Sequence, residues 1–594
     1  MSGDLVVPST APAPSAAKRD RYKWVVLTNT TVGVLIAMID SSIVLIAMPA
    51  IFRGIGLDPL GPGNSFFLLW MMLGYLIVTS VLVVSFGRIG DMYGRVRMYN
   101  LGFLIFTIAS IMLSIDWMNG RSAALWLISM RVLQGVGGAF IAANSGAIIT
   151  DTFPPNQRGL ALGINNVASM AGRFLGLVVG GVLASIDWRL VFWVSVPFGV
   201  FGTLWGYFKL EERGVRQKSS IDWLGNITFA VGLILVMVGI TYGIQPYGGH
   251  VMGWTSPKVM LEIGLGIVLL ILFAFIELRV PNPMFQMRLF RIKPFLFGSL
   301  SSFLSALARG GLMFMLIIWL QGIWLPLHGY SFEQTPLWAG IAMLPLSIGM
   351  VVAGPISGYL SDRYGPRLFA TGGMLLTALS FALLEMLPTN FNYVWFGLIV
   401  FMSGVGAGLF ASPNRAGVMN SLPASQRGSG GGMNTTFQNS AQVLSIGVFF
   451  TLMIIGLSDS LPRTLAAGLQ SGGVSGPTVD HVAHLPAVSV LFAAFLGYNP
   501  IQHLVGSSAL SQLPPSVANH LTSSSYFPSL ISEPFRSGLH EAFAFAMAAC
   551  LIAAMASWSR GRRYVRDEID APAPGLTIDP RPEALTTEEA APRA

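Results

Sequence analysis

The sequence has few charged residues, one cysteine and no nucleotide-binding lysine motif, and each shortage excludes a class of protein. Lysine, arginine, aspartate and glutamate make up 10% of the 594 residues. Soluble domains carry about 25%, so we expect the chain to lie in a membrane. The single cysteine, Cys550, excludes an intramolecular disulfide. The glycine runs lack the lysine of a G-x-x-x-x-G-K-[ST] loop, which argues against an ATP-driven pump within this chain.

Signals for secretion, metal binding and catalysis are also missing. Residues 1–17 are rich in Pro, Ala and Ser but show no signal-peptide pattern, so we expect a disordered cytoplasmic tail. No pair of the seven histidines has a convincing metal-ligand spacing, and no Ser/His/Asp or Cys/His set is placed for catalysis. We therefore expect no metal, no cofactor and no enzyme. The net charge of +8 fits the cytoplasmic loops of a membrane protein better than nucleic-acid binding.

What the sequence has in abundance is long apolar runs, and a helix needs roughly 20 such residues to cross a bilayer. This pattern predicts an all-α integral membrane protein with 14 transmembrane helices. The expected spans are approximately residues 24–52, 65–86, 98–115, 123–149, 160–184, 190–208, 221–244, 258–277, 295–325, 336–357, 368–387, 393–416, 429–457 and 538–558.

Lysine and arginine are distributed unevenly between the two sides that these spans create. With the N-terminus inside, 23 of them fall in cytoplasmic segments up to Arg566, and six fall in external segments. Positive charge collects in cytoplasmic loops, so we expect a multi-pass protein of the plasma membrane with both termini in the cytoplasm. We expect it to contact membrane lipids and to function as a monomer.

One apolar segment does not fit this layout. Residues 485–497 number 13, and a span there would place the arginines that follow the last helix outside the cell. We therefore expect residues 458–537 to form an external loop whose apolar part folds onto the outer rim or interface. A loop of this length is expected to have a role beyond connection.

The sequence repeats itself at an interval of about 270 residues. GRIGDMYGRVR at 87–97 returns as GYLSDRYGPR at 358–367, with a glycine, an aspartate and a glycine matched at an offset of 271. QGVGGA at 134–139 and FPPNQRG at 153–159 return as SGVGAG and LPASQRG at an offset of 269. Two parallel copies predict two six-helix bundles related by a pseudo-two-fold axis, plus two inserted helices. The expected division is a cytoplasmic tail at 1–23, a first bundle at 24–208, the inserted pair with its flanking loops at 209–290, a second bundle at 291–566 and a disordered cytoplasmic tail at 567–594.

These motifs resemble those of the major facilitator superfamily, in particular its fourteen-helix drug:proton antiporter family. Residues 87–97 are similar to the superfamily's helix 2–3 loop signature, and LISMRVLQGVGG at 127–138 is similar to its helix 4 signature. GRFLGLVVGG at 172–181 resembles the helix 5 antiporter signature, although Leu177 replaces its proline, and Met92 replaces an arginine of the loop signature. The residues assigned by resemblance are, for the gating loops, Gly87, Asp91, Gly94, Arg95, Arg97, Asp151, Gly358, Asp362, Arg363 and Gly365, and, for the helix 5 motif, Gly172, Gly176, Gly180 and Gly181.

The resemblance implies that residues 87–97 act as a latch at the cytoplasmic surface. We expect Asp91 to face the N-terminal end of helix 13, from Gly428, where the helix dipole favours an acid. We also expect Arg95 to reach Asp151 at the inner end of helix 4.

Charged residues inside the spans are expensive, so they are candidates for function. At 1.5 Å per residue, Asp40 lies about 24 Å from the inner end of its helix, and Arg131 about 12 Å from the outer end of its own. A lateral pair is therefore possible. Asp40 is either a proton-coupling carboxylate that responds to Arg131, or half of a permanent ion pair that only fixes helix packing. The resemblance favours coupling, with Arg131 as the helix 4 arginine that the family associates with proton transfer.

Two further arginines, Arg173 and Arg309, are expected at comparable depth, and Arg415 lies near the inner end of helix 12. One central acid then faces several bases, which favours neutral amphipathic or anionic cargo over cations. The arginines could instead bond to carbonyl groups between helices. Other residues that could line the substrate cavity are Trp70, Trp319, Gln321, Asn165 and Asn166.

Three functions remain open from the sequence. The first is a secondary transporter for proton-coupled export of lipophilic or amphipathic compounds by alternating access, similar to multidrug efflux and antibiotic resistance. Its partners would be a small lipophilic substrate and protons, and no nucleic acid. The second is a dedicated exporter of an endogenous anionic lipid or metabolite, clamped by Arg173 and Arg309. The third is a receptor or assembly factor that acts through the external loop.

Overall fold

The computed structural model describes residues 16–561 except 59, 60, 62, 213–221, 282, 284, 424, 425, 475, 476, 498, 500, 502–504 and 507–509. In this part of the chain, fourteen segments are helical, long and apolar enough to cross a membrane. They coincide in number and order with the apolar runs of the sequence, so the predicted all-α membrane fold is confirmed. The remaining described residues form short helices and turns, with one isolated β-bridge between Tyr247 and His250.

The first six spans form one bundle, called here the first half. Its central contacts are α1 with α5, and α2 and α3 with α4. The helices are α1 (Ala16–Gly54), α2 (Asn64–Tyr93), α3 (Arg95–Ser114), α4 (Gly120–Thr152), α5 (Pro155–Ile186), α6 (Leu190–Trp193) and α7 (Ser195–Lys209).

The last six spans form the second half and repeat the packing of the first. α10 packs on α16 as α1 packs on α5, and α13 and α14 pack on α15 as α2 and α3 pack on α4. The elements are α10 (Lys293–Ile318), the π-helix η2 (Trp319–Trp324), α11 (Leu325–Leu327), α12 (Thr335–Ala342), α13 (Leu344–Tyr364), α14 (Pro366–Met386), α15 (Tyr393–Asn420), α16 (Arg427–Ser458) and α23 (Tyr526–Ser559).

Two spans, α8 (Trp223–Gly243) and α9 (Pro257–Arg279), lie between the halves in sequence and pack on each other. A short 3₁₀ helix, η1 (Met287–Arg291), leads into the second half. α8 contacts both α2 and α16, whereas α9 leaves large apolar side chains such as Leu261, Val268 and Phe275 more than half exposed. Such a surface is stable in lipid and not in water.

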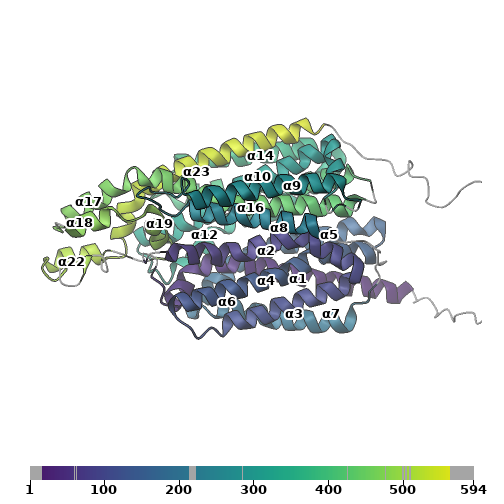
Figure 1. The fold of residues 1–594 in the computed structure, drawn as a ribbon, viewed down its shortest axis with the longest axis horizontal. Coiled ribbons are helices and arrows are strands. Elements are labelled where there is room, and N and C mark those ends of the chain that lie inside the picture. Colours follow the sequence, from purple (N-terminus) through teal and green to yellow (C-terminus); the bar gives the residue numbers. More distant parts are fainter. Residues whose placement is uncertain are drawn as a thin grey trace, which may run out of the picture.

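The helices of both halves run along the long axis of the molecule, and the two halves lie next to each other across it (Figure 1). They meet through α5 against α12 and α13, and through α2 against α16. This surface of contact between the halves is called the seam below. Following the predicted orientation, we call the end that carries Asn64 and Gly120 the outer end, and the end that carries Gly94 and Gly365 the inner end.

The segment between α16 and α23 forms α17 (Leu461–Ser471), α18 (Pro477–Ala483), α19 (Ala487–Phe495) and α22 (Pro515–Thr522) at the outer end (Figure 1). α17, α18 and α22 project beyond the bundle, but α19 does not. All nine residues of α19 are buried, against α10, α16 and η2 of the second half and α2 of the first. The apolar segment therefore enters the core between the halves instead of lying on the outer rim, because it has no charged side chain to keep in water.

Candidate functional site

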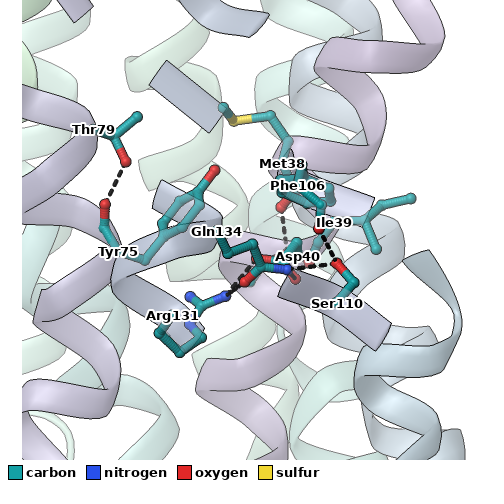
Figure 2. Close-up of polar contacts among 10 residues, drawn as sticks. Met38, Ile39, Asp40, Tyr75, Thr79, Phe106, Ser110, Arg131 and Gln134 are labelled. Atoms are coloured by element: carbon teal, nitrogen blue, oxygen red, sulfur yellow. Dashed lines mark hydrogen bonds and ion pairs between the residues drawn. The ribbon is translucent and has the colours of Figure 1, made fainter. Parts of the chain in front are cut away.

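The centre of the first half holds a buried network of charged and polar side chains around Asp40 (Figure 2). Asp40 on α1 is 0% exposed and Arg131 on α4 is 2% exposed. Arg131 Nη1 lies 2.5 Å from Asp40 Oδ2, so the structure brings together the two residues expected to pair. The helices α1 and α4 contact each other, which places these side chains at one depth.

Three further residues complete this network and were not predicted from the sequence. Gln134 Nε2 donates to Asp40 Oδ1 at 2.8 Å and to Ser110 Oγ at 2.9 Å, while Gln134 Oε1 accepts from Arg131 at 2.6 Å. The guanidinium of Arg131 also lies 4.6 Å from the centre of the Tyr75 ring. Gln134 stands three residues after Arg131 on α4, and this spacing on one helix face was the available signal.

The helix 5 glycines face two different partners. Gly172, Gly176 and Gly180 form one stripe against α1, and a Cβ on Gly176 would lie 2.1 Å from Ser42 Oγ and 2.5 Å from the Ile39 carbonyl oxygen. α1 and α5 therefore touch through backbone beside Asp40. Gly181 instead meets α12, where a Cβ would lie 2.5 Å from Leu337 Cα.

Leu177, which replaces the proline of the signature, lies on the face of α5 that contacts the second half. Its carbonyl oxygen would be 2.7 Å from a Cβ on Gly340 of α12. Gly340, which has no side chain, therefore lets α12 pack closely against this turn of α5.

The predicted arginines lie at the seam between the halves. Arg309 Nη2 of α10 lies 3.6 Å from Met350 Sδ of α13, and Arg173 stands on α5 one turn after Met170, which lies beside Gly354 of the same helix α13. Arg415 of α15 donates to Asn166 Oδ1 of α5 at 3.5 Å, across the seam. Beside it, Asn165 Nδ2 is buried and forms no hydrogen bond within the described residues.

The remaining cavity candidates lie further out. Trp319 is fully buried among Phe391, Phe396 and Phe543, and its Nε1 donates to the Thr389 carbonyl, which is a packing environment. Gln321 Nε2 donates across the seam to the Ile46 carbonyl at 3.3 Å. Trp70 packs beside Phe66 on α2. None of these three contacts the arginines in the described structure.

The inner loop of the first half forms a compact ionic cluster. Arg95 pairs with Asp91 at 2.7 Å and with Asp151 at 2.6 Å, as expected for Arg95. The carboxylate of Glu212, just after α7, accepts from the backbone N–H groups of Arg95 and Val96 at 3.0 and 3.1 Å. This carboxylate caps the positive end of the α3 dipole.

The structure explains the second glycine of this loop motif. Gly94 has φ of 114°, and a Cβ there would lie 2.5 Å from the Glu212 carboxylate. Only glycine fits this position. Arg97 is exposed, and Gly87 faces Ala143 of α4. The expected contact of Asp91 with the start of α16 remains a prediction, since the side chains of residues 427 and 428 lie outside the described part.

The second copy of the loop has the same backbone but other partners. Gly365 repeats the positive φ, at 87°, and Gly358 faces Ser412 of α15. Arg363 is exposed and lies over its neighbour Tyr364, 5.6 Å from the ring centre. The side chain of Asp362 lies outside the described residues.

A buried arginine closes the inner end of the second half. Arg560, just after α23, donates to Ser557 Oγ at 3.0 Å and to the Asn414 carbonyl at 3.4 Å. Burial lowers the pKa of its guanidinium to about 10. After α7, the last helix of the first half, the chain instead carries the acids Glu211 and Glu212.

At the outer end α19 closes the seam. Phe492 and Phe495 pack against Phe450 of α16 and Phe314 of α10, with ring centres 5.2 and 5.0 Å apart. From the first half, Arg53 Nη1 donates to the Leu496 carbonyl, just after α19, at 3.4 Å. The helix thus bridges both halves.

The repeated bundles, the buried ion pair and the charged seam between the halves define a membrane transporter with two six-helix halves. Among the described residues, no group of three His, Cys, Asp or Glu side chains is placed to hold a metal ion. The sequence profile of the Major Facilitator Superfamily matches residues 30–446, and the chain belongs to this superfamily. It is a transporter and not an enzyme.

Characterised relatives extend over most of the chain. It is 30% identical over 457 residues to the methyl viologen resistance protein SmvA of Salmonella typhimurium, covering 76% of this chain and 86% of that protein. It is 27% identical over 434 residues to the riboflavin transporter RibZ of Clostridioides difficile, covering 72% and 88%. A bacterial homologue of the lysosomal transporter Spinster, solved facing inward, shares the fold with a TM-score of 0.55 and 15% identity over 91% of this chain and 97% of that one.

Proposed function

We propose that this transporter is a proton-coupled exporter of lipophilic or amphipathic compounds, of the multidrug-efflux type, that works by alternating access. The observation that carries the proposal is the Asp40–Arg131–Gln134 network. The network buries the titratable carboxylate of Asp40 completely. Asp40 lies on α1, which packs on α5, and α5 contacts the second half. The resistance in the name of the relative SmvA supports an outward direction of transport.

The chemistry of coupling follows from the contacts of Asp40. Its two oxygens accept hydrogen bonds from Arg131 and Gln134, and this arrangement favours the ionised form of the carboxylate. A proton on Asp40 removes the attraction to Arg131 and frees the guanidinium. Because α1 touches α5 by backbone at Gly172 and Gly176, a shift of α1 moves the helix that faces the second half. In this proposal, a change in the protonation of Asp40 therefore changes the contacts between the two halves.

The inner latch supplies the switch between conformations. Arg95 holds α2 and α4 together through Asp91 and Asp151, and Glu212 holds the start of α3. We assign Gly358, Asp362, Arg363 and Gly365 of the second copy to the matching loop of the other half, where the backbone turn at Gly365 is the same but the described partners differ. We place both termini in the cytoplasm and the protein, as a monomer, in the plasma membrane, on the strength of the lysine and arginine distribution.

Reconstitution tests the proposal directly. Proteoliposomes loaded with a lipophilic dye should move it with an imposed proton gradient and lose this drive in Asp40→Asn, which keeps the shape of the side chain without its titration. Ser129→Ala on the exposed face of α4 is the matched control, because its hydroxyl only bonds to Leu125 of the same helix. Transport at one rate with and without the gradient would overturn proton coupling.

The unpaired arginines at the seam favour a second candidate, a dedicated exporter of an endogenous anionic lipid or metabolite.

A further inference from the structure

Three arginines at the seam between the halves have no acidic partner in the part of the chain that the structure describes. Arg173 comes from α5, Arg309 from α10 and Arg415 from α15. Within the described part of the chain, no ion pair reaches any of them; the recorded neighbours are Met350 for Arg309 and Asn166 for Arg415. Asp40 cannot serve, since Arg131 and Gln134 already occupy its oxygens.

Arg173 and Arg309 converge on one turn of α13. Arg309 contacts Met350, and one turn further along α13 the space beside Gly354 is occupied by Met170 of α5. Met170 and Arg173 are three residues apart and share a face of α5. Arg173, one turn outward of Met170, is therefore level with Met350, which Arg309 contacts from the other half.

Arg415 extends this positive charge towards the inner end. Its partner Asn166 lies seven residues before Arg173 on the same face of α5, about 10 Å away along the helix. Further outward on that face the seam is closed, because Leu177 and Gly181 meet Gly340 and Leu337 of α12 at backbone distance. The charged track thus runs from the inner end to mid-depth and stops there.

The physical chemistry of this arrangement calls for an anion. Arginine stays protonated, and several such charges close together at membrane depth are unfavourable without a counter-charge. The side chains of Arg173 and Arg415 are exposed, so they are open to such a counter-charge. A guanidinium also binds carboxylate or phosphate oxygens with two parallel hydrogen bonds. The thioethers of Met170 and Met350 beside the arginines offer an adaptable apolar surface.

We infer that the cargo is an amphipathic anion, whose acidic head passes from Arg415 at the inner end to Arg173 and Arg309 at mid-depth while its apolar body lies along the methionines. This inference rests on the proposed transport function and narrows its substrate class. The shared chemistry is a carboxylate or a phosphate on a lipophilic chain. Transport of protons is a separate matter that belongs to Asp40.

Equilibrium binding to the purified full-length protein in nanodiscs tests the inference without any gradient. The probes are a dansyl-labelled long-chain carboxylate, the phosphate ester of the same chain and the neutral amide of the same chain. We expect at least one acidic probe to bind about tenfold more tightly than the amide, and Arg173→Gln, Arg309→Gln and Arg415→Gln each to weaken acidic probes by about tenfold. The order of the two acidic probes identifies the head group.

The controls separate charge recognition from structure. Arg463→Gln should change no affinity, because Arg463 is exposed on the outer helix α17 and donates to the Asp459 carbonyl beside it. Lysine at the three seam positions should restore part of the acid preference that the glutamine variants lose, because lysine keeps the positive charge but cannot form the two parallel hydrogen bonds of a guanidinium. Equal binding of amide and acids by the unaltered protein, or equal loss of both in the glutamine variants, would overturn the inference. Acid-selective binding without gradient-driven transport would instead uphold it and count against proton coupling.

Discussion

Alternating access requires the outer end to open, and α19 stands in the way. Its nine apolar residues are buried between both halves, so in the proposed export cycle we expect α19 to withdraw towards the outer aqueous side when cargo leaves. We predict that Phe492→Ala shifts the protein strongly towards the withdrawn state. Phe492 is 0% exposed and packs edge-on against Phe450 of α16.

The size of the effect follows from where the lost contacts exist. Truncating a fully buried phenylalanine costs about 3–5 kcal/mol. Phe492 makes these contacts only while α19 is buried between the halves. The substitution therefore destabilises this buried state and leaves the withdrawn state nearly unchanged. With 1.4 kcal/mol per factor of ten, the withdrawn population should rise by on the order of 10²–10³.

A single reporter cysteine measures this shift. In a Cys550→Ala background, Val490→Cys places a thiol on the fully buried α19, and a charged, membrane-impermeant maleimide added outside labels it only when α19 is withdrawn. Phe492→Ala should raise the labelling rate by the factor above. Leu465→Ala is the matched control, because Leu465 is equally buried but lies in α17, which packs on α18 and α23. An unchanged labelling rate in Phe492→Ala, or an equal rise in Leu465→Ala, would refute the idea that α19 withdraws to open the outer end.

Three further predictions concern the first half. Gln134→Leu should slow gradient-driven transport by about tenfold or more, since it removes two hydrogen bonds to charged groups worth about 1.5–3 kcal/mol each, and Ser110→Ala should have the smaller effect in the same assay. Glu212→Gln should lower the thermal stability of the purified protein by about 1 kcal/mol by weakening the α3 cap, and a stability equal to that of the unaltered protein would contradict the capping role. Gly176→Ala should reduce the yield of monodisperse protein, because its Cβ meets Ser42 and Ile39, whereas Gly163→Ala on the same helix has open space and should not.

The sequence was sufficient for the spans and, with the family resemblance, for two pairs of side chains, Asp40 with Arg131 and Arg95 with Asp151. Fourteen apolar runs predict fourteen helices because the bilayer sets their length, independently of tertiary contacts. Asp40 and Arg131 could be matched because depth is a simple product of residue count and helical rise. A charge in lipid is so costly that few residues compete for the role.

Other parts of the site depend on contacts that the sequence alone does not reveal. Gln134 and Ser110 are uncharged, and such residues occur throughout the spans, so only the fold shows that these two touch Asp40. Glu212 caps a helix that begins 117 residues before it, through the return of α7 beside α3. The apolar segment of the outer loop is too short to span, and length does not tell whether it lies on the rim or, as found, within the core.

The two halves share one scaffold but divide the charges, and this division separates coupling from cargo recognition. Gly176 meets Ile39 and Ser42 of α1, and Ser445, 269 residues later, bonds to Leu307 and Gly311 of α10. This correspondence places Arg309 in the second half where Asp40 stands in the first. Asp40 is neutralised within its own bundle by Arg131, whereas Arg309 has no acidic partner among the described residues and contacts Met350 at the level of Arg173. On the proposed mechanism, a proton would be exchanged inside the first half while the second half and the seam hold an anion, and α5, which touches both α1 and α13, would connect the two events.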